Sequence, residues 1–158
     1  MKSLVAFTLL LVLLMGCSPA ADVDDSSPSI VGSWRLESWT VANDTPRCAE
    51  EEGGASGQIM YSRDGHMSAQ LGCAGLSMGE PGSMTSGEAI ARMTRRHFGY
   101  YGTYALDEAA QTVTHHVMGS TAETWVGRDL VRSFVFEGPD RLVLTPAESE
   151  GRLVWLRN

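Results

Sequence analysis

Apolar and polar positions alternate along most of the chain, in short runs that are separated by turn residues. This alternation is typical of β-strands that bury one face. Dipeptides such as Asp64-Gly65, which favour the tight turns of β-hairpins, lie between neighbouring runs. Because most runs follow one another in such hairpins, we expect an all-β fold, a small antiparallel barrel of about eight or nine strands. The predicted strands cover residues 30–41, 57–62, 66–71, 100–106, 111–118, 130–137, 141–145 and 151–157, with a further short run around Trp125.

One segment departs from this two-residue period. The sequence from Thr85 to Glu88 fits a capping box, which marks the start of a helix, and Gly99 fits a helix C-terminus. Apolar residues between them recur at helical spacing. The pattern therefore predicts one inserted helix over about 86–98, lying across the barrel. The Gly- and Ser-rich stretch before it, 72–84, is expected to be a long surface loop or a lid over a cavity mouth.

The N-terminal segment has the pattern of an export signal. Lys2 precedes an uncharged apolar stretch, 4–15, which is shorter than the roughly 20 residues of a membrane span. The stretch ends in Leu14-Met15-Gly16-Cys17, which resembles the bacterial lipobox. The resemblance implies a lipoprotein in which Cys17 carries the lipid. The alternative is an ordinary signal peptide, with cleavage near residue 20 or 21 and loss of Cys17.

These boundaries divide the chain into a signal peptide at 1–16, a flexible tether at 17–29 and the barrel domain at 30–158. The tether is polar, acidic and proline-containing, with no hydrophobic period, a composition that favours disorder. Residue 18 is Ser rather than Asp, and by the lipoprotein sorting rule this implies the outer membrane. We therefore expect a protein anchored by lipid in the cell envelope, on the periplasmic face of the outer membrane in a Gram-negative organism.

Charge limits the set of partners. The chain has 12 basic and 19 acidic residues and a net charge of −7, and Lys2 is its only lysine. Nucleic-acid binding requires basic patches that neutralise phosphates, so this balance argues against a nucleic acid partner. It equally argues against electrostatic adhesion to anionic lipid, so the lipid anchor is the expected membrane contact.

Cys48 and Cys73 are the cysteines of the predicted domain. An oxidising compartment favours a disulfide between them, which would contribute about 3 kcal/mol in the chain-entropy model. Two free, buried thiols are the alternative. The pair lacks the CxxC spacing and the paired histidine of a zinc site, so no metal is expected.

Short motifs are spread along the whole domain. They are Ile30-Val31-Gly32-Ser33-Trp34-Arg35-Leu36, Gly57-Gln58-Ile59-Met60-Tyr61-Ser62-Arg63-Asp64-Gly65-His66-Met67-Ser68, Tyr101-Gly102-Thr103-Tyr104, Val113-Thr114-His115-His116-Val117, Trp125-Val126-Gly127 and Leu153-Val154-Trp155. Together they resemble the bacterial and fungal lipocalin-like domain family over almost all of 30–157. The Gly32-x-Trp34 pair also resembles the first-strand signature of true lipocalins, whereas their second signature, Thr-Asp-Tyr, is not evident. The resemblance implies a calycin-like barrel and no particular shared activity.

Side-chain alternation in the run 130–137 places Arg132 on the same face as Phe134 and Phe136. We expect this aromatic face to point into the barrel and to take Arg132 with it. An inward arginine is destabilising unless it is paired. Either Arg132 stacks on Trp34 or bonds to strand-end carbonyls and seals one end of the barrel, or it anchors a ligand that carries a carboxylate.

His115, Tyr104 and Trp125 are the other candidate ligand-binding residues. His115 alternates with two valines that are expected to face inward, so it is either a hydrogen-bonded core residue or a ligand contact, and haem ligation is a further alternative. Adjacent His115 and His116 point to opposite faces, so they do not chelate one metal. Tyr104 either brings a hydroxyl group inside the barrel or packs in the core.

Three functions fit these features. The first and favoured one is a membrane-tethered binding module that holds a small apolar or amphipathic molecule in the barrel. The second is an envelope interaction or inhibitor module with a filled barrel and a binding face around 72–84. The third is an isomerase or cyclase for an apolar substrate, with His115, Tyr104 and Arg132 in one pocket. The chain has no nucleophile elbow, P-loop, dinucleotide fingerprint or zinc-protease motif, so no catalytic residue and no cofactor are assigned.

Overall fold

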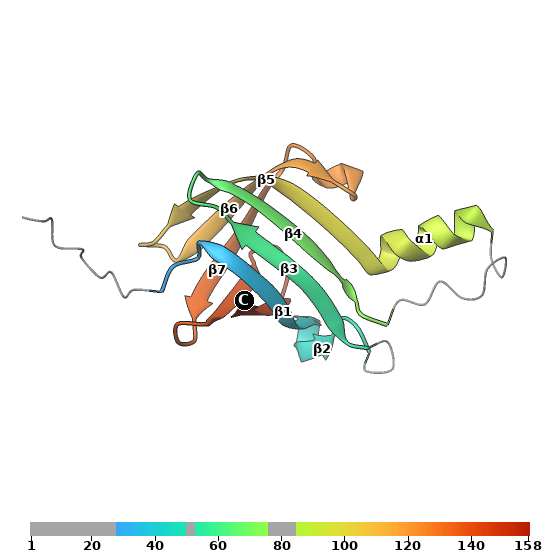
Figure 1. The fold of residues 1–158 in the computed structure, drawn as a ribbon, viewed down its shortest axis with the longest axis horizontal. Coiled ribbons are helices and arrows are strands. Elements are labelled where there is room, and N and C mark those ends of the chain that lie inside the picture. The colour runs from blue at the N-terminus through green and yellow to red at the C-terminus, as the bar shows by residue number, and fades with distance from the viewer. Residues whose placement is uncertain (1–27, 50–52, 76–84) are drawn as a thin grey trace, which may run out of the picture.

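The computed structural model describes residues 28–49, 53–75 and 85–158. In these residues nine strands form one antiparallel sheet that curves round and closes on itself (Figure 1). The elements in chain order are β1 (Gly32–Val41), η1 (Ala42–Asp44), β2 (Thr45–Pro46), β3 (Ala55–Tyr61), β4 (His66–Cys73), α1 (Ser86–Arg96), β5 (His97–Asp107), β6 (Thr112–Ser120), η3 (Glu123–Trp125), β7 (Asp129–Phe136), β8 (Arg141–Pro146) and β9 (Arg152–Arg157).

The sheet closes through β1, which pairs with three other strands. Residues 32–35 pair with β3, and residues 34–40 pair with β9, with a register shift between Leu36 and Ser38. The two-residue β2 pairs with the end of β1. The strands from β3 to β9 follow in sequence order, each hydrogen-bonded to the next. This confirms the predicted all-β fold, here a closed eight-stranded antiparallel barrel with β2 as an extra strand.

Side chains that alternate along the strands fill much of the barrel. The largest fully buried ones include Trp34 of β1, Tyr61 of β3 and Trp155 of β9. Burial of each large apolar side chain contributes roughly 1.5–3 kcal/mol relative to exposure. The core draws on every strand except β2. Its members are Ile30, Trp34, Leu36, Ile59, Tyr61, Met67, Ala69, Leu71, Tyr100, Val113, Val117, Leu130, Phe134, Leu142, Leu144, Leu153 and Trp155.

Helix α1 begins as predicted and ends earlier. The Glu88 carboxylate accepts hydrogen bonds from the N–H and hydroxyl groups of Thr85, both at 2.8 Å, and the Glu88 N–H donates to Thr85 Oγ1. This confirms one inserted helix, which ends two residues before the approximate end predicted at 98, because His97 and Phe98 belong to β5 and pair with the end of β4. No loop separates α1 from β5, so nothing turns the helix back over the barrel. In Figure 1 the helix extends away from the barrel rather than across it, contrary to the expectation.

The short run around Trp125 is a 3-10 turn, η3, and the strand predicted there is wrong. The backbone N–H of Trp125 donates to the carbonyl of Ala122 within the turn, at 2.9 Å, instead of to a neighbouring strand. The element joins β6 to β7 and packs the indole ring of Trp125 against Phe98 and Tyr100 of β5. A residue expected within a strand therefore lies in the connection between two strands.

A disulfide ties the segment before β3 to the end of β4. Cys48 is buried and bonded to Cys73, with 5.5 Å between their Cα atoms. This confirms the disulfide that the sequence predicts. The segment interpreted as a loop or lid, 72–84, begins with the last residues of β4 and a turn, while 76–84 lie outside the described residues.

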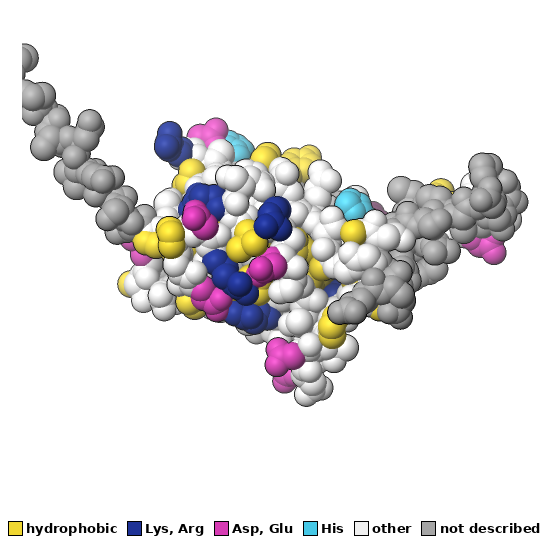
Figure 2. Space-filling view, turned by 60° about the horizontal axis from the view of Figure 1, so that its bottom comes forward, with side chains coloured by type: hydrophobic (Ala, Val, Ile, Leu, Met, Phe, Trp, Pro, Cys, Tyr) yellow, Lys and Arg dark blue, Asp and Glu magenta, His cyan; other side chains and the backbone are white. Residues whose placement is uncertain are grey.

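The outer surface of the barrel carries charges of both signs, and Figure 2 shows arginines and carboxylates interspersed over one face. Arg141 pairs with Glu37 and with Glu137, each at 3.0 Å, and Arg152 pairs with Glu137 at 2.7 Å. These side chains are partly exposed, so each pair contributes at most about 1 kcal/mol. The charged surface supports solubility more than it supports the fold.

Candidate functional site

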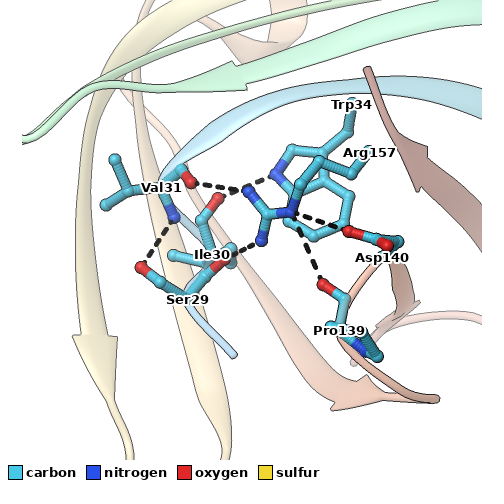
Figure 3. Close-up of polar contacts among 7 residues, drawn as sticks. All are labelled: Ser29, Ile30, Val31, Trp34, Pro139, Asp140 and Arg157. Atoms are coloured by element: carbon cyan, nitrogen blue, oxygen red, sulfur yellow. Dashed lines mark hydrogen bonds and ion pairs between the residues drawn. The ribbon is translucent and has the colours of Figure 1, made fainter. Parts of the chain in front are cut away.

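Arg157 closes one end of the barrel (Figure 3). Its guanidinium group stacks on the indole ring of Trp34, 4.1 Å from the ring centroid. It donates hydrogen bonds to the carbonyl of Val31 at 3.1 Å and to that of Ser29 at 2.7 Å, and it lies 3.5 Å from the carboxylate of Asp140. The last strand is thereby fixed to the segment that precedes the first one.

Gly32 makes room for this arrangement. Its φ angle is +140°, and a Cβ atom at this position would lie 2.8 Å from Arg157 Nη1. Glycine is therefore favoured both by the backbone and by the space that the guanidinium group occupies. In this chain, the Gly-x-Trp pair therefore supplies the ring on which Arg157 stacks and the space that its guanidinium group occupies.

The interpretation in which Arg132 stacks on Trp34 and seals the barrel is wrong, because Arg157 occupies that place. Sequence reasoning missed Arg157, although a signal for it exists. The alternation of β9 that points Trp155 inward points Arg157 the same way, and Arg157 lies opposite Trp34 in the strand register.

The other end of the barrel opens into a cavity of about 840 Å³. This volume is in the range of sites that hold one drug-sized molecule. The lining residues come from every strand except β2 and β6, together with η3 and the adjoining loops. They are Trp39, Val41, Arg47, Ile59, Leu71, Cys73, Phe98, Tyr100, Ala122, Trp125, Arg128, Leu130, Val131, Arg132, Leu144, Pro146, Glu148, Ser149, Gly151, Leu153 and Trp155.

Aromatic rings form a continuous part of the cavity wall near its mouth. Phe98 packs edge-on against Trp39 at 5.6 Å and against Trp125 at 5.2 Å between ring centroids. Trp125 in turn packs edge-on against Tyr100, at 5.6 Å. Such edge-to-face pairs hold the rings in fixed orientations, so this wall is pre-formed.

Arg132 lies at the inner limit of the cavity on β7. Leu130 and Arg132 line the cavity, whereas Phe134 and Phe136, the next inward residues of β7, do not. Phe134 packs against Phe136, which in turn packs against Trp34, so these rings fill the closed end. Arg132 is half-buried at the boundary between the filled and the open part of the barrel.

Behind the cavity wall, His115 connects two buried tyrosines. Its Nε2 atom lies 2.8 Å from the hydroxyl oxygen of Tyr61, and its Nδ1 atom lies 2.9 Å from that of Tyr100. Burial lowers the pKa of His115 to about 3, and the nearby charges of Arg132 and His116 act in the same direction. A neutral imidazole donates from one nitrogen and accepts at the other, so one tyrosine donates to His115 and the other accepts from it.

Tyr100 joins this buried group to the cavity. Burial raises the pKa of its hydroxyl group, while the charge of Arg132 and a hydrogen bond from that guanidinium group act in the opposite direction. Tyr100 therefore stays protonated at physiological pH. Arg132, Tyr100, His115 and Tyr61 form one chain of polar contacts that runs from the cavity floor into the core.

The structure separates the candidate residues. Trp125 and Arg132 line the cavity. His115 is fully buried behind Tyr100. Tyr104 donates to the carbonyl of Ser62 at 2.8 Å and packs on Tyr61, so its hydroxyl group is away from the cavity lining. The three residues required by the isomerase or cyclase hypothesis therefore do not meet in one pocket.

Sequence reasoning missed four lining aromatics, Trp39, Phe98, Tyr100 and Trp155. Phe98 and Tyr100 share the inward face of β5. Their alternation is hard to detect from the sequence because Phe98 also fits the period of the preceding helix. The indole N–H of Trp155, also in the lining, is buried without a hydrogen-bond partner among the described side chains and backbone.

The sequence profile of the lipocalin-like domain matches residues 31–155. Among solved structures, a redesigned β-barrel is 9% identical with a TM-score of 0.43, and the match covers 82% of this chain and 91% of that chain. A DUF4847 family protein from Bacteroides vulgatus is 12% identical with a TM-score of 0.44, over 80% of this chain and 92% of that one. No curated protein matches. Because the profile covers the barrel from its first strand into its last, the chain belongs to the lipocalin-like domain family.

Proposed function

We propose that this chain is a membrane-tethered lipoprotein of the cell envelope whose barrel binds a small apolar or amphipathic molecule. The observation that carries the proposal is the cavity of about 840 Å³, which is open at one end and lined mostly by aromatic and aliphatic side chains. A ligand that covers these walls removes apolar surface from water, which contributes roughly 25 cal/mol per Å². The family to which the chain belongs is compatible with this use of the barrel.

The open cavity also distinguishes between the alternatives. An interaction or inhibitor module with a filled barrel requires side chains to occupy the interior from end to end. Here Phe134, Phe136 and Trp34 fill the closed end only, and the lining of the cavity begins at Arg132. The binding module is therefore the better supported hypothesis.

The point at which the proposed tether joins the barrel suits ligand exchange. The N-terminal residues 1–27, which carry the export signal and Cys17, lie outside the described residues, and no helix in the described ranges is long and apolar enough to span a membrane. The first described residues are held at the closed end of the barrel, where Arg157 binds the carbonyl of Ser29. A lipid anchor attached through this segment leaves the mouth at the opposite end unobstructed.

Native mass spectrometry tests the binding function. The chain from residue 18 onward is exported in its own host with a cleavable signal peptide and purified gently, and its native and denatured masses are compared. We expect a mass excess in the native state that disappears on denaturation and gives the mass of the ligand. A bare native mass, unchanged after incubation with a lipid extract of the host, contradicts the proposal.

Metabolic labelling tests the tether. Cells that express the full chain are grown with an alkyne-bearing fatty acid, which marks lipidated proteins. We expect label on the wild-type chain and none on Cys17→Ala, because the thiol that receives the lipid is absent. An unlabelled wild-type chain that begins near residue 20 or 21 indicates an ordinary signal peptide and overturns the tether.

A further inference from the structure

Arg132 is a half-buried cation with no ionic partner among the described residues. The ion pairs of the described arginines are those of Arg128, Arg141, Arg152 and Arg157, and within the described ranges no carboxylate lies within 4.0 Å of Arg132. Its polar neighbours are the hydroxyl of Tyr100 and the neutral imidazole behind it. A guanidinium group partly removed from bulk water is stabilised by an opposing charge, so the cavity floor is a favourable place for an anion.

The net charge of the cavity lining also favours an anion. Its lining carries three arginines and one glutamate, a formal charge of +2, although the chain as a whole carries −7. Arg128 pairs with that glutamate, Glu148, at 3.2 Å on the exposed rim. The remaining lining arginines are Arg47, over the ring of Trp39 near the mouth, and Arg132 at the floor. An acidic protein with a cationic cavity favours anionic ligands over cationic ones.

We infer that the ligand is a carboxylic acid, that Arg132 and Tyr100 bind its carboxylate at the cavity floor, and that its apolar body fills the aromatic part of the cavity. The inference rests on the proposed binding function and specifies the ligand class. The apolar wall of Trp39, Phe98 and Trp125 lies between the floor and the mouth, so the acid group enters first and the body follows.

The donors at the floor match a carboxylate. A guanidinium group presents a planar fork of N–H donors that fits a planar carboxylate with one negative charge. The described floor supplies one such fork and one tyrosine hydroxyl. A phosphate or sulfate group has more oxygen atoms to satisfy and, for phosphate, more charge, which calls for a larger set of donors than this floor holds.

The buried histidine completes the arrangement. If Tyr61 donates to Nε2 of His115, the imidazole donates from Nδ1 to the oxygen of Tyr100, and the Tyr100 hydroxyl is then free to donate to a carboxylate. In this pattern every hydrogen bond points toward the anion. His115 acts as a positioning residue for Tyr100 and does not itself contact the ligand.

Three probes with one apolar body test the inference. Naphthaleneacetic acid, its neutral amide and naphthylethylamine are titrated calorimetrically at pH 7.5 into the full chain held in lipid nanodiscs, with empty nanodiscs as the blank. We expect the wild-type chain to bind the acid about tenfold more tightly than the amide, and the amine least, because a charge-assisted hydrogen bond at the floor favours the acid alone.

Variants at two arginines locate the acid group. Arg132→Gln should remove the preference for the acid and change the affinity for the amide less than twofold, which also shows that the cavity is intact. Arg132→Lys keeps the charge without the fork and should keep part of the preference. Arg152→Gln, the matched control on the outer surface, should keep all of it because Arg152 lies outside the lining and already has a carboxylate partner, Glu137.

The possible outcomes distinguish the carboxylate inference from the proposed binding function. Equal binding of acid and amide by the wild-type chain, or loss of the preference in Arg152→Gln but not in Arg132→Gln, overturns the inference and leaves the binding function intact. The same holds if native mass spectrometry finds a bound molecule without an acid group. A chain that binds none of the probes and is bare by native mass spectrometry overturns the inference and the binding function together.

Discussion

Two inward arginines, Arg132 and Arg157, show how differently one residue type is used in this barrel. Arg157 has a ring, a carboxylate and three carbonyl groups, those of Ser29, Val31 and Pro139, as partners, and it holds the closed end together. Arg132 has a tyrosine hydroxyl as its neighbour and faces a cavity. The first arrangement is a complete structural contact, whereas the second leaves the guanidinium group available to a ligand.

Replacing Arg157 tests its structural role. Arg157→Gln removes the stacking on Trp34 and the hydrogen bonds to three carbonyls, so we expect the free energy of unfolding to fall by about 2–3 kcal/mol in urea denaturation. Arg152→Gln is the matched control on the same strand. It removes only a partly exposed pair with Glu137 and should change the free energy by less than about 1 kcal/mol. Equal losses in the two variants argue against a special role for Arg157.

His115 makes the stability of the protein depend on pH. Its pKa is about 3 in the folded state and near 6.5 in the unfolded chain, so below pH 6.5 only the unfolded chain takes up the proton. The free energy of unfolding therefore falls on acidification through this window, by about 2 kcal/mol from His115 between pH 6.5 and pH 5. In His115→Gln, which cannot titrate, that part of the decrease should be absent. Denaturation curves of both proteins at the two pH values measure the difference, and identical pH dependence would show that the histidine is accessible to protons in the fold.

At the level of the elements, the strands were readable from the sequence because a two-residue period is a local property of the chain. The capping box identifies the start of helix α1, whereas the helical period does not reveal that the helix ends at Arg96. Phe98 fits a helical period, and only its pairing with Leu71 of β4 places it in β5. Trp125 likewise has strand propensity, while the connection between β6 and β7 requires a turn at that point. These errors occur where long-range pairing overrides local preference.

The disulfide links the segment before β3 to the end of β4 at the cavity mouth. Cys73 lines the cavity, and Cys48 follows Arg47, which lies over Trp39. The double variant Cys48→Ser/Cys73→Ser should lose about 3 kcal/mol of unfolding free energy, because the unfolded chain is no longer cross-linked. Urea denaturation with and without a reductant measures this. The reductant should lower the stability of the wild-type chain to that of the variant and leave the variant unchanged, whereas a variant as stable as the oxidised protein refutes the expectation.

At the scale of the whole molecule, the barrel could be predicted and the cavity could not. Closure follows from the number of strands and their hairpin order, which the sequence displays. A cavity is the volume that the inward side chains of several strands fail to fill, so it depends on how distant residues meet. The sequence predicts that Arg132 points inward. The depth of the cavity, however, is limited by Phe136 and Trp34, which fill the space beyond Arg132.

The pairing of β1 with β9 makes the fold a single cooperative unit. A chain that ends at residue 151 lacks β9 and Arg157, so β1 and β8 each keep an unpaired edge and the closed end loses its central contact. We expect this chain to show no native near-ultraviolet circular dichroism from Trp34 and to aggregate. A soluble monomer with the wild-type spectrum would show that the remaining strands suffice.

The same pairing sets the order in which the molecule can assemble. Trp34, near the first residue of the barrel, pairs with Arg157, near the last. A chain that crosses a membrane N-terminus first delivers β1 long before β9, so the barrel has no means to close during passage. Contacts of such wide sequence separation also form slowly. An exported chain, as proposed here, would therefore stay in a form that a translocation channel can thread until its C-terminal strand arrives, and its early strands would need protection from self-association throughout that interval.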